Sequence, residues 1–377
     1  MFNSEDTISA CLESIVNIDH QPLEVIVVND GSIDKSVEVT QDFIEKNEGA
    51  GINFTVLVDE INRGISSAKN RGLKHMKGAY FFFAGSDDIQ FPHRVSEPLA
   101  YLKENPTVDI VYSDCELWHE ALGEKNYRKR GFPTGMTNEN SFLHQLKRSY
   151  LWSGVLFARR SARLEFDEEL SSAVDYDWYF KHYLKGSSIH FIDEPLARYR
   201  LHDKNTSKKL RESTNNVLKI FQKHDFGKAY EDLVKTTNPN ELRISFAWYH
   251  FTLKEFDHAL EKLSKVETEN FDGNFLEATI HASKSDFAKA ADRFRSICEI
   301  NSDPPEALNN LAVCLIRSSG EISEARVLLT RATEINPNYL DAKNNLLMIS
   351  AELFDPEKLS LTIKPLRTEL THIDSYE

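Results

Sequence analysis

The sequence predicts an α/β domain followed by an all-α repeat domain. In the first half, apolar runs such as Glu24–Val28 and Phe54–Val58 alternate with helix-like stretches. Such alternation favours a mostly parallel sheet with helices on both faces. Past about Ser207 only helical patterns remain. The expected parts are a first domain at 1–207, a helical linker at 208–240, the repeats at 241–354 and a C-terminal tail at 355–377.

Composition excludes several classes of protein. The chain has 377 residues, 41% of them hydrophobic, which is enough for two or more cores. Its net charge of −14 disfavours nucleic acid as a partner. Four cysteines without C-x-x-C spacing fit neither a disulfide framework nor a zinc site, so we expect a cytoplasmic protein. No apolar run approaches the roughly 18 residues of a membrane span, although peripheral contact with the inner membrane face stays open.

The first elements follow from local patterns. Ile8, Leu12 and Ile15 share one face of a predicted N-terminal helix. The uniformly apolar run Glu24–Val28 is typical of a parallel strand buried on both faces. The turn sequence at 29–32 ends that strand, and Asp34 can cap the next helix.

Further strands and helices alternate through the rest of the domain. Strand 54–58 is followed by a helix from about Ile65 to Met76, then by an apolar run at Phe81–Phe83. The later expected elements are a helix at 92–104, a strand at 108–113, a loop-rich segment at 128–152 with a short helix at 141–147, a strand at 154–158, a helix at 175–184 and a strand at 189–192.

Two adjacent carboxylates, Asp87 and Asp88, follow the apolar run Phe81–Phe83. Open α/β sheets bind ligands at the carboxyl ends of their strands, and hard divalent cations prefer carboxylate oxygens. The pair is therefore a candidate metal site. The alternative is a helix N-terminus, where acids before Pro92 would cap free N–H groups. The residues alone do not decide between the two.

An internal repeat lies in the helical half. The segment Glu306–Leu311 recurs as Asp341–Leu346, 35 positions later, and Phe256 with Ala259 recurs 31 positions later as Phe287 with Ala290. Periods near 34 built from two helices resemble tetratricopeptide repeats. We expect about three repeats in 242–352, whose stacked helices bind a peptide or protein partner. The alternatives are that they shield the first domain or form a homodimer.

The first 207 residues resemble the family 2 glycosyltransferases, which have the nucleotide-sugar-binding α/β fold called GT-A. Each matching motif is short, but six occur in the family's order. The matching segments are Phe2-Asn3, Glu24–Asp34, Asn62-Arg63-Gly64 with Ala68–Gly72, Ser86-Asp87-Asp88 with Pro92, Asp175, and Tyr199-Arg200-x-His202.

This resemblance implies a role for each matched residue. Asp175 would be the catalytic base, and the metal would be held by Asp87, Asp88 and His202. Nucleotide-sugar contacts are implied for Asp30, Asn62, Lys69, Arg71, Ser86, Asp87 and Arg200. The structural alternatives are turn residues for Asp30 and Asn62, a solvated helix face for Lys69 and Arg71, a polar loop residue for His202 and a helix cap for Asp175.

The function implied is an inverting, metal-dependent glycosyltransferase. It would use Mn²⁺ or Mg²⁺ and move a sugar from a nucleoside diphosphate to a glycan, lipid-linked or protein acceptor, as in polysaccharide biosynthesis. Three departures favour the alternative of a non-catalytic adaptor: Gly85 and Val174 stand where the family has acids, and the family's first strand would precede Phe2. We therefore expect that either the given start misses N-terminal residues and the domain is truncated, or the sheet lacks that strand. The sequence does not identify the sugar or the acceptor.

Overall fold

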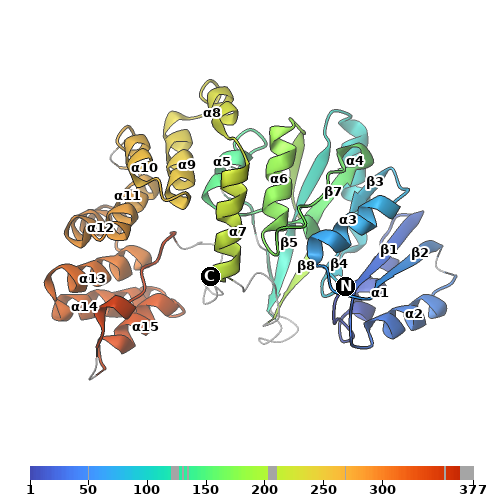
Figure 1. Ribbon diagram of the computed structural model, residues 1–377, viewed down its shortest axis with the longest axis horizontal. Coiled ribbons are helices and arrows are strands. Elements are labelled where there is room, and N and C mark those ends of the chain that lie inside the picture. The colour runs from blue at the N-terminus through green and yellow to red at the C-terminus, as the bar shows by residue number, and fades with distance from the viewer. Residues whose placement is uncertain are drawn as a thin grey trace. The chain divides into compact units, whose positions relative to one another are not determined.

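The protein was analysed as a computed structural model, which describes residues 1–49, 51–119, 127–129, 131–133, 136–202, 210–267, 269–351 and 354–365. For 119, 127–129 and 210–213 only the backbone is described. The expected boundary at Ser207, Gly135 of the loop-rich segment and residues 366–377 of the tail lie outside these ranges. The chain forms two compact units, Met1–Asp225 and Phe226–Glu377 (Figure 1).

A two-stranded parallel sheet begins the first unit. Strand β1 (Leu23–Asp30) pairs in register with β2 (Ile52–Asp59). Val27 packs against Ile8 and Leu12 of α1 (Ile8–Val16), whereas Val28 on the opposite face lies against α3 (Ile65–His75). Gly72 allows α3 this approach, because a Cβ there would lie 3.7 Å from the Val28 side chain. The predicted burial of this strand on both faces is confirmed at its carboxyl half. Helix α2 (Ser36–Lys46) connects the two strands.

The second sheet is mixed, which corrects the expectation of a mostly parallel one. Its strand order is β3-β7-β5-β8-β4, with β6 paired to β5. Only β5 and β8 pair in parallel, and the other pairings are antiparallel. The apolar runs indicated strands correctly, but they carry no information on pairing direction. The strands are β3 (Tyr80–Phe82), β4 (Ile89–Gln90), β5 (Ile110–His119), β6 (Tyr127–Lys129), β7 (Leu156–Arg159) and β8 (Ile189–Leu201).

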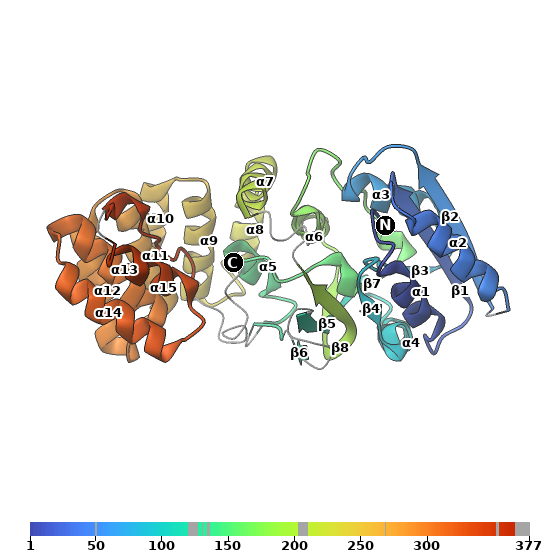
Figure 2. The ribbon, with the colours of Figure 1, turned by 90° about the horizontal axis from the view of Figure 1, so that it is seen from below.

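Helices cover this sheet on both sides. In Figure 2, α1 and α4 (Ser96–Glu104) lie on one side of β4, β5 and β8, and α6 (Val174–Leu184) lies on the other. Val111 and Phe157 of the sheet share a core with α1 and α4. The remaining helical segments of this unit are α5 (Ser141–Lys147), α7 (Leu210–Lys223), and the 3-10 turns η1 (Pro92–Arg94), η3 (Ser153–Val155) and η4 (Arg160–Ala162).

Helix α7 packs in the first unit, so the residues expected to form a linker are divided between the two units. The Phe221 ring lies 6.0 Å from the Tyr176 and Phe180 rings of α6. Asp177, buried beneath them, accepts a hydrogen bond of 2.8 Å from His224 and pairs with Lys181 at 2.7 Å. Aromatic packing and this ion-pair network together hold α7 against α6.

The N-terminal residues lie beside β1. The Met1 ammonium donates to the Val28 carbonyl at 2.7 Å, and the Asp30 N–H donates to the Met1 carbonyl at 2.9 Å. This alternation is the bonding pattern of a parallel strand. Strands β1 and β3 belong to separate sheets. The expectation that the sheet lacks the family's first strand stays a prediction.

The described part of the second unit consists of helices followed by a short non-helical segment after η6, and its helices are as expected for repeats. Its consecutive helices pack on one another, and the small residues Ala259, Ala290 and Ala342 are fully buried where helices approach. Within the described ranges, no helix of either unit has the length and apolar character needed to cross a bilayer. The helices are α8 (Gly227–Leu233), α9 (Pro239–Thr252), α10 (Phe256–Leu263), α11 (Phe271–Ser283), α12 (Phe287–Asn301), α13 (Pro305–Ser319), α14 (Ile322–Ile335), α15 (Leu340–Met348) and the turn η6 (Pro356–Lys358).

Candidate active site

The loop after β3 brings the acidic pair to the end of β8. Asp88 is 4% exposed, and its carboxylate accepts the Arg200 backbone N–H at 3.1 Å. The Arg200 side chain donates to the Asp87 carbonyl at 3.0 Å and lies over the Trp118 ring at 4.3 Å. Pairing of β4 with β8 supports this approach. The acids are thus tied to β8 and do not merely begin a helix.

Asp87 and His202 face each other across this loop. The His202 Nε2 lies 3.0 Å from the Asp87 carboxylate, and both side chains remain partly exposed. Asp87 and His202 are therefore in contact, although 115 positions separate them. The third residue assigned to the metal by sequence, Asp88, is bound instead to the Arg200 backbone N–H.

The electrostatics of this group suit a divalent cation. Burial, reinforced by the charge of Asp87, raises the pKa of Asp88 to about 8, and the Arg200 N–H and charge offset this only in part. Two neighbouring carboxyl groups that repel each other, with an imidazole in reach of Asp87, form a donor set that fits a divalent cation. A cation would relieve the repulsion.

Gly85 explains how the loop accommodates both acids. A Cβ at this position would lie 2.5 Å from the Asp88 Oδ2 and 2.9 Å from the Asp87 Oδ1. Real Cβ atoms essentially never approach so closely. The departure from the family motif therefore makes room for the two carboxylates that follow it.

A second group forms around Asp175 in the first turn of α6. Its carboxylate accepts a hydrogen bond of 2.7 Å from the Lys69 ammonium, which also donates to the Ser153 hydroxyl at 2.6 Å. The Lys69 ammonium lies 4.7 Å from the centre of the Phe166 ring. Ala173, with a left-handed φ of 57°, is the N-cap of α6. Asp175 is thus bound to Lys69 and is not the cap.

The predicted nucleotide residues take several different positions. Asp30 accepts the backbone N–H groups of Arg63 at 2.7 Å and Gly64 at 2.9 Å, so it fixes the loop after β2. Asn62, in that loop, is exposed. Arg71 pairs with Asp59 at 2.5 Å.

Ser86 contacts the N-terminal segment of the chain, which the sequence does not indicate. Its hydroxyl shares a hydrogen bond of 2.8 Å with the Ser4 hydroxyl. Gly85, which precedes Ser86, is held from α1, because the Cys11 thiol donates to the Gly85 carbonyl at 3.1 Å. The acidic loop is therefore supported from α1 as well as from β8.

Three neighbours of the site were missed by sequence reasoning. Ser153 and Phe166 contact Lys69, and Trp118 lies under Arg200. No motif marks them, because their partners lie 82 or more positions away in the chain or on another strand. Ser153 follows the loop-rich segment at 128–152, in which the sequence indicates no individual site residue.

Family models match both parts of the chain. The model described as "Glycosyl transferase family 2" matches residues 1–163, and the model described as "Tetratricopeptide repeat" matches residues 281–346. These matches confirm the resemblances proposed from the motifs. Asp175, Arg200 and His202 lie beyond the first matched segment.

Relatives among curated proteins are glycosyltransferases by name. "Uncharacterized glycosyltransferase RT0329" of Rickettsia typhi is 29% identical over 235 residues, covering 60% of this chain and 67% of the relative. An uncharacterized glycosyltransferase of Rickettsia felis is 28% identical over 214 residues, covering 56% of this chain but only 34% of the relative. EpsJ of Bacillus subtilis is 26% identical over 212 residues, covering 53% of this chain and 59% of the relative.

A solved structure supports the fold. Residues 1–349 of TarS from S. aureus, in complex with UDP-GlcNAc, align with a TM-score of 0.50 and 18% identity, covering 90% of this chain and 91% of that chain. At this identity the likeness concerns the fold alone. Residues 1–163 therefore match the family 2 glycosyltransferases and residues 281–346 match tetratricopeptide repeats, which supports a glycosyltransferase.

Proposed function

We propose that this protein transfers a sugar from a nucleoside diphosphate to an acceptor hydroxyl with inversion, in the presence of a divalent cation. The observation that carries the proposal is that the adjacent pair Asp87 and Asp88 meets His202 and Arg200 from a distant segment of the chain. A purely structural acid pair does not require an imidazole from the end of another strand.

Asp87 and His202 would hold the cation, and the buried Asp88 would add negative charge next to Asp87. The bound cation would supply positive charge that stabilises the leaving diphosphate. Arg200 would help to orient the diphosphate, because its guanidinium is fixed on the Trp118 ring and on the Asp87 carbonyl. The cation and the Arg200 guanidinium would together place positive charge beside the leaving diphosphate, on which negative charge develops.

Asp175 would act as the general base. Its carboxylate takes the proton of the acceptor hydroxyl as that oxygen forms a bond to the anomeric carbon, while the bond to the diphosphate oxygen breaks on the opposite face. A single displacement of this kind inverts the anomeric centre. Lys69 positions the carboxylate, and the 23% exposure of the Asp175 side chain leaves it accessible to an acceptor.

The nucleotide would lie against the ends of β1 and β2. Asp30 holds the backbone of the loop that includes Asn62, so in the free protein it fixes the position of this loop. Asn62 is exposed there and available to a ligand. Arg71 is engaged by Asp59, so a contact with the nucleotide would require that pair to separate.

The repeats would recruit the acceptor or a protein partner. The acidic residues assigned to catalysis all belong to the first unit, and recruitment is the usual role of stacked helical repeats. The acceptor would be a glycan, a lipid-linked molecule or a protein.

Donor hydrolysis with a panel of nucleotide sugars and Mn²⁺ tests the proposal. We expect hydrolysis of one donor that depends on metal and is lost in Asp87→Asn. The alternative function, a non-catalytic adaptor, is favoured by Val174 in place of the family's acid. It would be supported if the folded protein hydrolysed and transferred none of the donors.

A further inference from the structure

Two asparagines occupy the same position in successive repeats. Asn310 in α13 and Asn345 in α15 are 35 residues apart, which is the spacing of the internal repeat. Both side chains are fully buried. A buried carboxamide requires hydrogen-bond partners, because leaving one unsatisfied costs about 1–3 kcal/mol.

Each carboxamide binds both backbone polar groups of one residue in the segment after α15. Asn345 donates to the Ser360 carbonyl and accepts the Ser360 N–H, both at 2.8 Å. Asn310 donates to the Thr362 carbonyl and accepts the Thr362 N–H, also both at 2.8 Å. The two asparagines therefore bind residues two positions apart in the same way.

Alternate residues of an extended chain present their N–H and C=O groups to the same side. Asn310 and Asn345 thus imitate the edge of a neighbouring strand, a mode of peptide recognition that depends on the backbone. Arg317 extends it by donating to the carbonyls of Pro356, Glu357 and Leu359 at 3.0–3.2 Å.

Side chains of the bound segment contribute at only a few points. The Thr362 hydroxyl donates to Asp341 at 2.7 Å and is also hydrogen bonded to the Tyr339 hydroxyl. Leu359 is buried in the core of the repeats, and Leu361 packs against that core. Recognition at the other positions passes through the backbone, so a different extended segment with similar apolar residues and a similar Thr would fit.

We propose that Asn310, Asn345 and Arg317 form a binding site for an extended polypeptide, and that residues 356–362 fill it as a displaceable ligand within the same chain. This inference deepens the proposed partner-binding role of the repeats and does not rest on the transfer reaction. A partner peptide would have to compete with the chain's own segment.

Substitution of the resident segment tests this in the full-length protein. Thr362→Pro removes the N–H that Asn310 accepts, without altering the repeats. A labelled peptide covering 355–365 should bind this variant at least tenfold more tightly than it binds the wild type, since one fewer competing bond holds the resident segment. Addition of Asn345→Ala to Thr362→Pro should abolish the gain. Equal peptide affinity for wild type and Thr362→Pro, or no effect of Asn345→Ala, would overturn the proposal.

Modified peptides provide a matched control. N-methylation at Thr362 removes a donor that the site uses, whereas N-methylation at Leu361 alters an amide that faces the other side of an extended chain. Only the first change should reduce binding.

A measurement on the wild type covers the case in which Thr362→Pro fails to fold. Excess peptide should accelerate amide hydrogen exchange at Ser360 and Thr362 in the intact protein. An unchanged exchange rate would show that the peptide does not displace residues 356–362 and would refute the proposal. Donor hydrolysis, recorded in parallel, reports on the transfer reaction separately.

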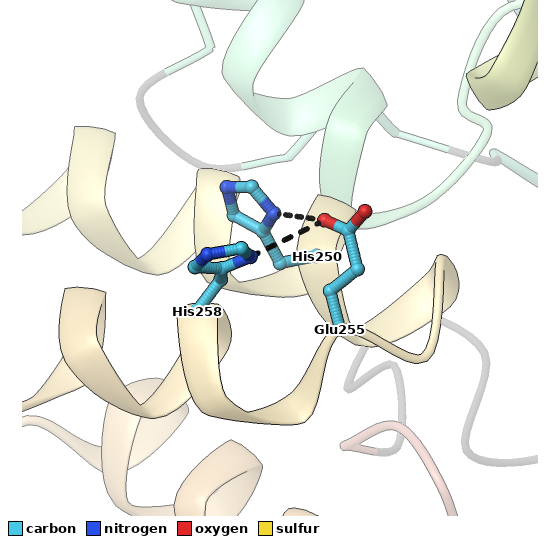
Figure 3. A group of neighbouring side chains, drawn as sticks. All are labelled: His250, Glu255 and His258. Atoms are coloured by element: carbon cyan, nitrogen blue, oxygen red, sulfur yellow. Dashed lines mark hydrogen bonds and ion pairs between the residues drawn. The ribbon is translucent and has the colours of Figure 1, made fainter.

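A different observation carries a second inference, in the turn between α9 and α10. The Nδ1 atoms of His250 and His258 both face the Oε2 of Glu255, at 2.7 and 3.8 Å (Figure 3). Ligand atoms of all three residues lie within 4.8 Å of one another. The turn is held by a hydrogen bond of 2.9 Å from the Glu255 N–H to the His250 carbonyl and by the left-handed Lys254, with φ of 61°.

We infer that these three side chains bind Zn²⁺ or a similar transition-metal ion. Bonds of about 2.1 Å in a tetrahedral site place the ligand atoms about 3.4 Å apart, so shifts below about 1 Å convert the present contacts into a coordination shell. Two imidazoles favour zinc over magnesium, which prefers oxygen ligands. The ion class thus differs from that of the candidate active site.

Zinc titration against a competing chelator dye tests the site. The full-length Asp87→Asn protein, in which the active-site group is impaired, should bind one Zn²⁺ that Mg²⁺ does not displace. Adding His258→Gln should weaken this binding at least about tenfold, since loss of even an outer hydrogen-bond partner costs a metal site about that much.

His281→Gln is the matched control, because the two nitrogens of His281 face different carboxylates, those of Glu277 and Asp286. It should leave zinc binding unchanged. Equal zinc affinity with and without His258, in variants whose circular dichroism matches the wild type, would overturn the inference.

Discussion

Replacement of Asp175 by Asn is the sharpest test of the proposed mechanism. The substitution preserves shape but removes the carboxylate that would accept the proton from the acceptor hydroxyl. It also breaks the 2.7 Å ion pair with Lys69, whose side chain is 13% exposed. Lys69 retains the Ser153 hydroxyl and the Phe166 ring as partners.

The expected magnitudes separate catalysis from stability. Loss of a general base typically lowers turnover by about 10²–10⁴-fold, or about 3–5 kcal/mol in activation free energy. Loss of a half-buried ion pair costs about 1–3 kcal/mol, between the values for exposed and buried pairs. A domain with about 5–15 kcal/mol of stability remains folded. We therefore expect a folded protein that binds donor normally but transfers sugar at least about a hundredfold more slowly.

Calorimetry of donor binding, thermal melting and initial transfer rates together measure these quantities. Asp193→Asn, which changes an exposed carboxylate of β8, is the control and should have wild-type turnover. Turnover near that of the wild type in Asp175→Asn would exclude Asp175 as the base.

A double-mutant cycle then tests the role of Lys69. If Lys69 acts by positioning the carboxylate, Lys69→Met should lower turnover in the wild-type protein but have little further effect in Asp175→Asn. Strictly additive losses would show that Lys69 acts independently, for example on the donor.

Four further predictions address the metal group, acid stability and domain organisation. Asp87→Asn should weaken the metal-dependent part of nucleotide binding; equal nucleotide affinity with and without metal in the wild type would contradict the assignment. Gly85→Ala should impair metal binding by displacing the two carboxylates that its Cβ would meet at 2.5 and 2.9 Å, measured by Mn²⁺ titration. Burial opposes ionisation of Asp177, but hydrogen bonds from His224 and Lys181 outweigh it and lower its pKa from 3.8 to about 2, so its stabilisation is present above about pH 4 and is lost as the pH falls to 2. Thermal melts of Asp177→Asn should therefore show a flatter dependence on pH in that range, and an unchanged slope would refute this. A chain ending at Asp225 should hydrolyse donor but transfer to the natural acceptor poorly, and full transfer activity would exclude recruitment by the repeats.

Local patterns in the sequence predicted individual elements well. The short helix at Ser141–Lys147 is found as expected, and α6 begins one residue before the expected position. Both follow from side-chain periodicity and turn chemistry, which act over a few residues. The 35-residue repeat predicted the helical unit for the same reason.

The sequence predicted which residues belong to the candidate site better than it predicted the contacts between them. Motif order indicated Asp87, Asp88, Asp175 and His202. The structure brings Asp87 to His202 and Asp88 to the Arg200 backbone, and their assignment to a metal stays a prediction. Motif order did not indicate that Asp175 would be bound by Lys69 or that Asp30 would support a loop. Nothing in the sequence indicated Ser153, because a serine after a loop is common and this one belongs to no recognisable motif.

The sequence by itself determined which segments become strands and helices, where the acidic residues follow a strand, and that the second half repeats. Those properties depend on periodic burial and on backbone preferences of neighbouring residues. Tertiary structure alone decided that β7 and β3 run antiparallel, that Lys69 meets Asp175, and that Asn310 binds Thr362. The physical reason is that such contacts join polar groups from distant segments, whose partners are chosen when the whole chain satisfies its buried hydrogen bonds together.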